Sequence, residues 1–139
     1  MNAFEKQRKV YLNLIKNVDA DFFVVHARHG SQTYADNADF SIYPECVATG
    51  KRIIANGDIS TREQVDSLKL VGVNGVMIGR LATADPGIFS RLKGIPTPSV
   101  PQLKVEYREL AARYATPPRY VQNITKRMDG LATSGKVQG

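Results

Sequence analysis

Polar and glycine residues follow two consecutive apolar runs in the middle of the chain. Asn56-Gly57-Asp58 comes directly after the first run, and Gly79-Arg80 comes after the second. A glycine lets backbone N–H groups approach an anion closely, and an arginine guanidinium can bind phosphate with two parallel hydrogen bonds. The pattern of residues 53–80 therefore predicts a binding site for an anionic, phosphate-bearing ligand. A structural alternative stays open, in which both glycines serve tight turns and Arg80 pairs with Asp58.

A third apolar run, residues 22–25, ends at His26 and Arg28. The two side chains are spaced i, i+2, so they can face the same side of an extended segment. The histidine could donate a hydrogen bond to a ligand carbonyl or ring nitrogen, and Arg28 could bind an acid or a phosphate. The alternative for His26 is a ring satisfied by backbone carbonyls. Cys46 falls within a predicted helix, away from the strand ends, and is interpreted as a packing residue.

The elements that must position these residues alternate between strand and helix. The apolar runs are not patterned with period two, which is typical of strands covered on both faces in a parallel sheet. Strand, loop and helix recur three times in about 75 residues, which favours parallel β/α units. The ligand site then lies at the carboxyl ends of the strands. The predicted strands are residues 22–25, 52–55 and 73–78, and the predicted helices are residues 3–18, 41–49, a segment from 60 to 71 and a segment from 85.

Local signals define the ends of these helices. Ser60 and Glu63 have the spacing of a capping box, in which the hydroxyl accepts from the backbone N–H of the acid and the acid reaches back. Val65, Leu68 and Val71 predict the buried stripe of that helix.

The helix from residue 85 is expected to use Asp85 as its N-cap, with Pro86 in its first turn. A Pro/Gly-rich linker, residues 94–99, follows it. Apolar spacing then predicts two more helices, one marked by Leu103, Tyr107, Leu110 and Tyr114 and one by Tyr120, Ile124 and Met128.

The charge of the chain is concentrated near its C-terminal end. The formal net charge is +6 over 139 residues. Residues 91–136 contain nine Lys and Arg against three Asp and Glu, a difference of +6, so the rest is near neutral. A basic tail on a neutral body is the charge distribution expected for binding a phosphate backbone.

The bulk composition narrows the class of protein. The length fits one domain, and no apolar run approaches the roughly 20 residues of a membrane-spanning helix. The first nine residues have no signal-peptide core. Cys46 is the single cysteine, so an internal disulfide is impossible and no metal-site spacing is present. We expect a cytoplasmic, reducing setting without a membrane partner.

The ordered set of motifs resembles the flavin-dependent tRNA dihydrouridine synthases. No single motif is decisive, and the match rests on their order over residues 21–92. The motifs are His26-Ala27-Arg28, Gln32-Thr33-Tyr34, Ala38-Asp39-Phe40, Ile54-Ala55-Asn56-Gly57-Asp58-Ile59, Gly75-Val76-Met77-Ile78-Gly79-Arg80 and Asp85-Pro86-Gly87-Ile88-Phe89.

The resemblance implies an α/β fold, a (β/α)8 TIM barrel followed by a helical domain that helps to hold tRNA. Such enzymes use FMN, reduced by NADPH, to saturate the 5,6 double bond of uridine. By position, the residues Asn56, Gly57, Asp58, Gly79 and Arg80 would hold the phosphate and ribityl region of FMN.

The other two candidates come from the first strand end. His26 would lie against the isoalloxazine ring or the target uracil, and Arg28 would belong to the same pocket.

The chain also departs from the family pattern. A full barrel takes about 250 residues, whereas this sequence provides about three C-terminal β/α units and a short helical tail. The family's catalytic cysteine and flavin-contacting lysine lie on earlier strands, so the catalytic set has no member here and Cys46 cannot replace it. The resemblance thus implies a fragment, inactive alone, with an FMN-binding region at 1–93 and a tRNA-binding tail at 94–139.

Two other interpretations remain open. The chain could be an FMN-binding half-barrel module that associates with itself or with a separate N-terminal half-barrel chain, since open sheet edges favour association. It could also be part of another FMN-dependent oxidoreductase that shares only the phosphate-binding loops.

Overall fold

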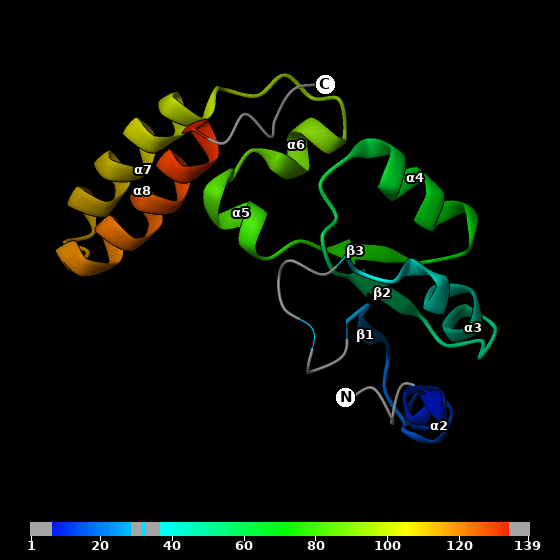
Figure 1. Cartoon of the computed structure of the whole chain (residues 1–139). Helices are drawn as coiled ribbons and strands as arrows, with labels where there is room; N and C mark the ends of the chain where they lie inside the picture. The colour runs from blue at the N-terminus through cyan, green and yellow to red at the C-terminus, as the bar shows by residue number, and fades with distance from the viewer. Residues whose placement is uncertain (1–6, 29–31, 33–36, 134–139) are drawn as a thin grey trace. The chain divides into compact units, whose positions relative to one another are not determined.

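The computed structural model describes residues 7–28, 32 and 37–133. The chain divides into two compact units, Met1–Ile78 and Gly79–Gly139, which we describe separately (Figure 1). The motif residues Thr33 and Tyr34 and the start of the predicted first helix lie outside the described residues. The predicted functional boundary between residues 93 and 94 stays a prediction.

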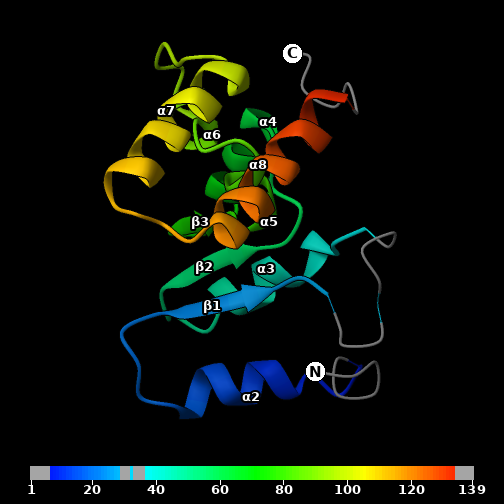
Figure 2. The same ribbon diagram turned by 90° about the vertical axis from the view of Figure 1, so that its left-hand side faces the viewer.

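The first unit is built on a three-stranded parallel sheet. Its strands are β1 (Phe23–His26), β2 (Ile53–Asn56) and β3 (Gly75–Met77), in the order β1-β2-β3. Figure 2 shows β1 and β2 side by side with their arrowheads at the same end. The prediction of three parallel strands joined through helices is confirmed, although the third strand is shorter than expected.

Within the described residues of this unit, four helical segments accompany the sheet. They are α2 (Val10–Asn17), the 3-10 turn η1 (Phe40–Ile42), α3 (Tyr43–Val47) and α4 (Arg62–Leu70). The core joins Ile15 of α2, Cys46 of α3 and Leu68 of α4 to the sheet residues Ile53 and Ala55. These helices therefore bury one face of the sheet.

The expectation of strands covered on both faces is wrong for β1. Val25 is buried, whereas its neighbour Val24, on the opposite face, is 40% exposed. Phe22, just before the strand, is 52% exposed. The reason is that the helices of this unit contribute their core residues to one face, and an apolar run alone cannot reveal whether a second layer is present.

The capping box of α4 begins one residue later than the sequence predicted. The Thr61 hydroxyl accepts from the Gln64 N–H at 3.2 Å, and the Gln64 side chain accepts from the Thr61 N–H at 3.1 Å. Thr61 has extended backbone angles, so it is the N-cap and Ser60 precedes it. Leu68 is buried as predicted, but Val71 lies past the helix end and is 40% exposed.

The second unit is helical. It contains α5 (Arg80–Ala84), α6 (Ile88–Leu92), α7 (Val100–Arg113) and α8 (Pro118–Thr133). The helices α7 and α8 form a hairpin (Figure 1), and α5 also packs against α8. In the part of the chain that the structure describes, no helix is long and apolar enough to cross a membrane.

The buried stripe of the α7–α8 hairpin differs from its prediction. Leu110 and Tyr114 are 48% and 74% exposed, and Ala111 is the buried residue of α7. The small alanine allows close packing, which a search for large apolar residues misses. On α8, Met128 is buried as predicted, whereas Tyr120 is 49% exposed.

Asp85 does not act as the N-cap of α6, because that helix begins after Gly87. Asp85 is fully buried, and its carboxylate accepts from the Gly87 N–H at 3.0 Å. It also accepts two hydrogen bonds from Arg91, at 2.9 and 2.8 Å. The bidentate ion pair thus fastens the turn before α6 to the helix itself.

Candidate functional site

The carboxyl ends of the three strands place three side chains in one row. His26 pairs in register with Asn56, and Asn56 pairs with Met77. Residues in register on parallel strands project from the same face, which here is the face opposite the buried Val25 and Ala55. His26 is exposed, and the Asn56 amide donates to the Met77 sulfur at 3.6 Å. The row presents an imidazole, an amide and a thioether on an accessible sheet face.

The turn after β2 is tightly constrained. Gly57 has φ +127°, a conformation that residues with a side chain rarely adopt. A Cβ atom there would lie 3.2 Å from the Ala38 Cβ. Asp58 follows with φ +48°. The glycine is therefore required both by the turn and by the close approach of residue 38.

Arg28 and Asp58 form an ion pair between the ends of β1 and β2. The Arg28 side chain is only 6% exposed, and that of Asp58 is 34% exposed. The pair joins two segments that are 30 residues apart in the chain. The guanidinium of Arg28 thus has its charge balanced within the protein and fixes one strand end against the other.

Tyr43, on α3, is a site-supporting residue that the sequence reasoning missed. It is fully buried, and its hydroxyl lies 2.9 Å from the Asn56 carbonyl and 3.1 Å from the Val25 carbonyl. The hydroxyl also accepts from the Asn56 N–H at 3.1 Å. Burial raises the pKa of Tyr43, so the phenol keeps its proton. It secures the backbone of Asn56 from the buried face.

Cys46 lies in the core, as its interpretation as a packing residue required. Burial raises the pKa of the Cys46 thiol to about 11, and the nearby carboxylate of Glu45 contributes in the same direction. The thiol is therefore protonated and shielded at neutral pH. Within the described residues, no group of three or more His, Cys, Asp or Glu side chains could hold a metal ion.

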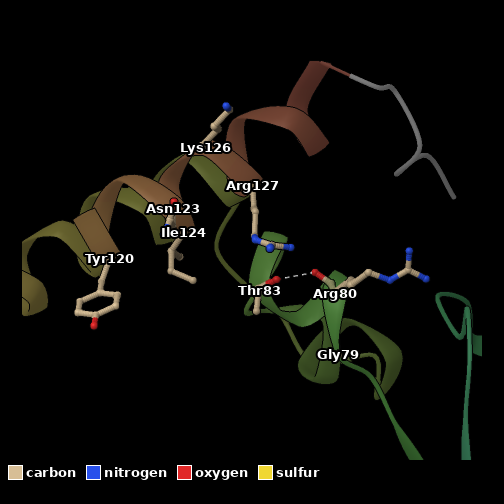
Figure 3. Close-up of a pocket in the computed structure, with 8 residues that line it drawn as sticks. All are labelled: Gly79, Arg80, Thr83, Tyr120, Asn123, Ile124, Lys126 and Arg127. Carbon is tan, nitrogen blue, oxygen red and sulfur yellow. Dashed lines mark hydrogen bonds between the residues drawn. The ribbon is translucent and has the colours of Figure 1, made fainter. Parts of the chain in front are cut away.

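The remaining two candidates, Gly79 and Arg80, belong to the second unit. They begin α5, where the Thr83 hydroxyl donates to the Arg80 carbonyl at 2.7 Å. Both line a groove of about 900 Å³ between α5 and α8 (Figure 3). The groove residues are Gly79, Arg80, Thr83, Tyr120, Asn123, Ile124, Lys126 and Arg127.

The structure thus brings five of the seven predicted site residues together within one unit. These are His26, Arg28, Asn56, Gly57 and Asp58, whereas the other two begin the helical unit.

Comparison with known proteins identifies the family. A human "tRNA-dihydrouridine(47) synthase [NAD(P)(+)]-like" protein is 35% identical over 71 residues, which cover 50% of this chain and 11% of the human protein. A "Probable tRNA-dihydrouridine synthase" of Helicobacter pylori (strain ATCC 700392 / 26695) is 33% identical over 103 residues, or 68% of this chain and 30% of that protein. This chain therefore spans less than a third of the length of these relatives. The sequence model of the family described as "Dihydrouridine synthase (Dus)" matches residues 5–131, and the chain belongs to the dihydrouridine synthase family.

Proposed function

We propose that this chain is the C-terminal part of a flavin-dependent enzyme that reduces uridine to dihydrouridine in tRNA. Family membership supports the reaction class, and the names of both relatives given above include the words tRNA-dihydrouridine synthase. FMN, reduced by NADPH, would supply the hydride for the uracil 5,6 double bond. The chain would provide the phosphate end of the cofactor site as part of a (β/α)8 barrel, in the cytoplasm.

The row of His26, Asn56 and Met77 carries this proposal. It lies on the sheet face opposite the helices α2, α3 and α4, and in a closed barrel the corresponding face lines the interior. The imidazole and the amide can offer hydrogen bonds to the polar edge of a flavin or a uracil, and the thioether offers a soft apolar contact. These groups fit such a ring system.

The constrained turn after this row fits the phosphate end. Gly57 permits a close approach, and the ion pair of Arg28 with Asp58 holds the turn in place. Gly79 and Arg80 would add backbone N–H groups and a guanidinium for the phosphate. In this assignment Arg28 and Asp58 support the site through their pairing with each other.

The proton that completes the reduction would come from a cysteine outside this chain. Cys46 is unsuited to that role because it is buried in the core and its pKa is raised to about 11. We therefore expect the chain alone to bind its cofactor without completing the reaction.

The helical unit would bind the tRNA. Its charge supports this assignment, because residues 91–136 hold nine basic against three acidic side chains. A second candidate function is a half-barrel module that associates with itself or with a separate N-terminal chain. The exposure of Phe22 and Val24, 52% and 40%, favours such an association.

Titration of FMN with the purified chain tests the cofactor assignment. We expect saturable quenching of flavin fluorescence, weakened at least about fivefold in Asn56→Ala and in Arg80→Ala, since each removes a charge-assisted or amide hydrogen bond. Lys69→Ala, a change on the exposed end of α4, is the matched control and should keep the affinity of the parent chain. Absence of binding by the folded chain, or equal affinity in all variants, would contradict the assignment.

A further inference from the structure

The groove between α5 and α8 combines three kinds of side chain that together suit a nucleic acid. Lys126 and Arg127 are cationic, Tyr120 is aromatic, and Asn123 carries an amide. In Figure 3, Arg127 reaches from α8 toward Thr83 on α5, and Tyr120 projects from α8 nearer the start of that helix. None of the eight lining residues is acidic.

The acidic residues nearest in sequence are engaged elsewhere. Asp129 is the single acid of α8 and forms an ion pair with Lys104 of α7. Asp85, which follows α5, is buried against Arg91. In the described part of the chain, no acid is ion-paired with Arg127. The guanidinium of Arg127 therefore brings positive charge to the groove that an anionic ligand can neutralise.

Tyr120 offers a flat surface for stacking. Its side chain is 49% exposed, and the guanidinium carbon of Arg119 lies 4.7 Å from the centroid of its ring. Arg119 also donates to the Tyr120 hydroxyl at 2.9 Å, which fixes the two side chains relative to each other. The guanidinium lies over one face of the ring, and a cation next to an aromatic ring is a combination that binds a nucleobase together with its adjoining phosphate.

We propose that this groove binds an unpaired segment of RNA, with a base stacked on Tyr120, its edge on the Asn123 amide and a phosphate on Arg127. This inference rests on the proposed function, which makes tRNA the source of the RNA. A volume of about 900 Å³ accommodates one or two nucleotides. Double-stranded RNA is instead recognised along many base pairs, and its stacked bases do not expose their faces to an aromatic side chain.

Fluorescence anisotropy with the 139-residue chain tests the proposal. The probes are a labelled single-stranded RNA decamer, a hairpin of the same composition with a minimal loop, and an unmodified tRNA transcript. We expect the decamer to bind at least about fivefold more tightly than the hairpin stem, because only its bases are free to stack.

Substitutions separate stacking from charge. Tyr120→Leu should weaken decamer binding at least about fivefold, whereas Tyr120→Phe, which keeps the ring, should stay within about twofold. Arg127→Gln should weaken binding and reduce the slope of log affinity against log salt by about 0.7, the value for one contact to a single strand. Arg108→Gln removes the same charge from an exposed position of α7 outside the groove and should change the decamer affinity by less than about twofold.

The outcomes distinguish this inference from the proposed function. Suppose that the chain binds the tRNA transcript but that Tyr120→Leu and Arg127→Gln affect the affinity no more than Arg108→Gln does. The proposal for the groove is then overturned, while the proposal that the helical unit binds tRNA survives. Equal affinity for the hairpin and the decamer would also overturn it. If none of the three RNAs binds the folded chain, both the groove proposal and the tRNA assignment fail.

Discussion

The strand ends of the first unit and the groove of the second use arginine in opposite ways. Arg28 is 6% exposed and ion-paired with Asp58, so its charge holds two strand ends together. Arg127 is exposed and faces a groove lined without acids. The comparison teaches that the burial and pairing of a basic residue, more than its type, indicate whether it serves the fold or a ligand.

The same contrast appears within the helical unit. Arg91 forms two hydrogen bonds with the buried carboxylate of Asp85, whereas Arg119 lies over the exposed ring of Tyr120. A count of basic residues in the tail treats these as equal. The structure separates them, and the following predictions test that separation, from the largest expected effect to the smallest.

Asp85→Asn should produce the largest loss of stability, about 3 kcal/mol in the free energy of unfolding measured with urea. The substitution leaves the Arg91 guanidinium without its buried carboxylate, which is costly even though that side chain is 27% exposed. Asp66→Asn is the control, because Asp66 forms an exposed ion pair with Arg62 that contributes about 0.5 kcal/mol or less. Similar losses in both variants would contradict the structural role of the buried pair.

Gly57→Ala should cost about 2 kcal/mol, because it forces a side chain into a left-handed conformation and against Ala38. Gly130→Ala is the matched control, since this glycine is in α8 and an added methyl group there would have nothing within 4 Å. The control should stabilise the chain by about 0.5–1 kcal/mol through helix propensity. Thermal unfolding of both variants provides the measurement.

Tyr43→Phe should cost about 1 kcal/mol, the usual net value of a buried hydrogen bond. The lost hydroxyl contacts the Asn56 backbone, so FMN affinity should also fall if that backbone positions the cofactor-binding amide. Tyr114→Phe, on a side chain that is 74% exposed, should alter neither quantity. A Tyr43→Phe variant that lost stability but kept the parent FMN affinity would show that Tyr43 does not support the cofactor site.

The titration of the Cys46 thiol should have almost no effect on the free energy of unfolding at neutral pH and a clear effect at high pH. Because burial raises the pKa of its thiol from 9.0 to about 11, the folded state holds a proton that the unfolded state releases. Stability should therefore fall as the pH rises from about 9 to about 11, and this part of the fall should vanish in Cys46→Ala. At a pH of about 8, a thiol reagent should modify the folded chain about 100-fold more slowly than the unfolded chain, which follows from the lower thiolate fraction.

Much of the first unit could be predicted because its signals are local. The apolar runs before His26, Asn56 and Gly79 predicted the strands, and the tight turn at Gly57 was the structural alternative that the sequence left open. The single exposed face of the sheet could not be predicted in the same way. Whether a strand is covered on one face or on both depends on which other elements pack against it. The sequence of a four-residue strand does not indicate which elements those are.

The supporting contacts were missed for the same reason. Tyr43 reaches Asn56 across 13 residues, and Asp85 reaches Arg91 across an intervening turn. The Tyr43 contact arises from tertiary packing, and the Asp85–Arg91 pair is a local contact between a turn and the following helix that the N-cap prediction for Asp85 overlooked. The shift of the capping box from Ser60 to Thr61 is a smaller error, caused by two neighbouring residues that can both serve as N-caps.

Parallel titrations of FMN and single-stranded RNA test the central proposal that the strand-end row of the first unit binds the cofactor and that the α8 side of the groove binds RNA. We predict a crossed result: Asn56→Ala weakens FMN binding at least about fivefold and leaves RNA affinity within about twofold, while Arg127→Gln does the reverse. If both substitutions weakened the binding of the same ligand, or if neither weakened the binding of FMN or RNA, the assignment of separate cofactor and RNA sites would be contradicted.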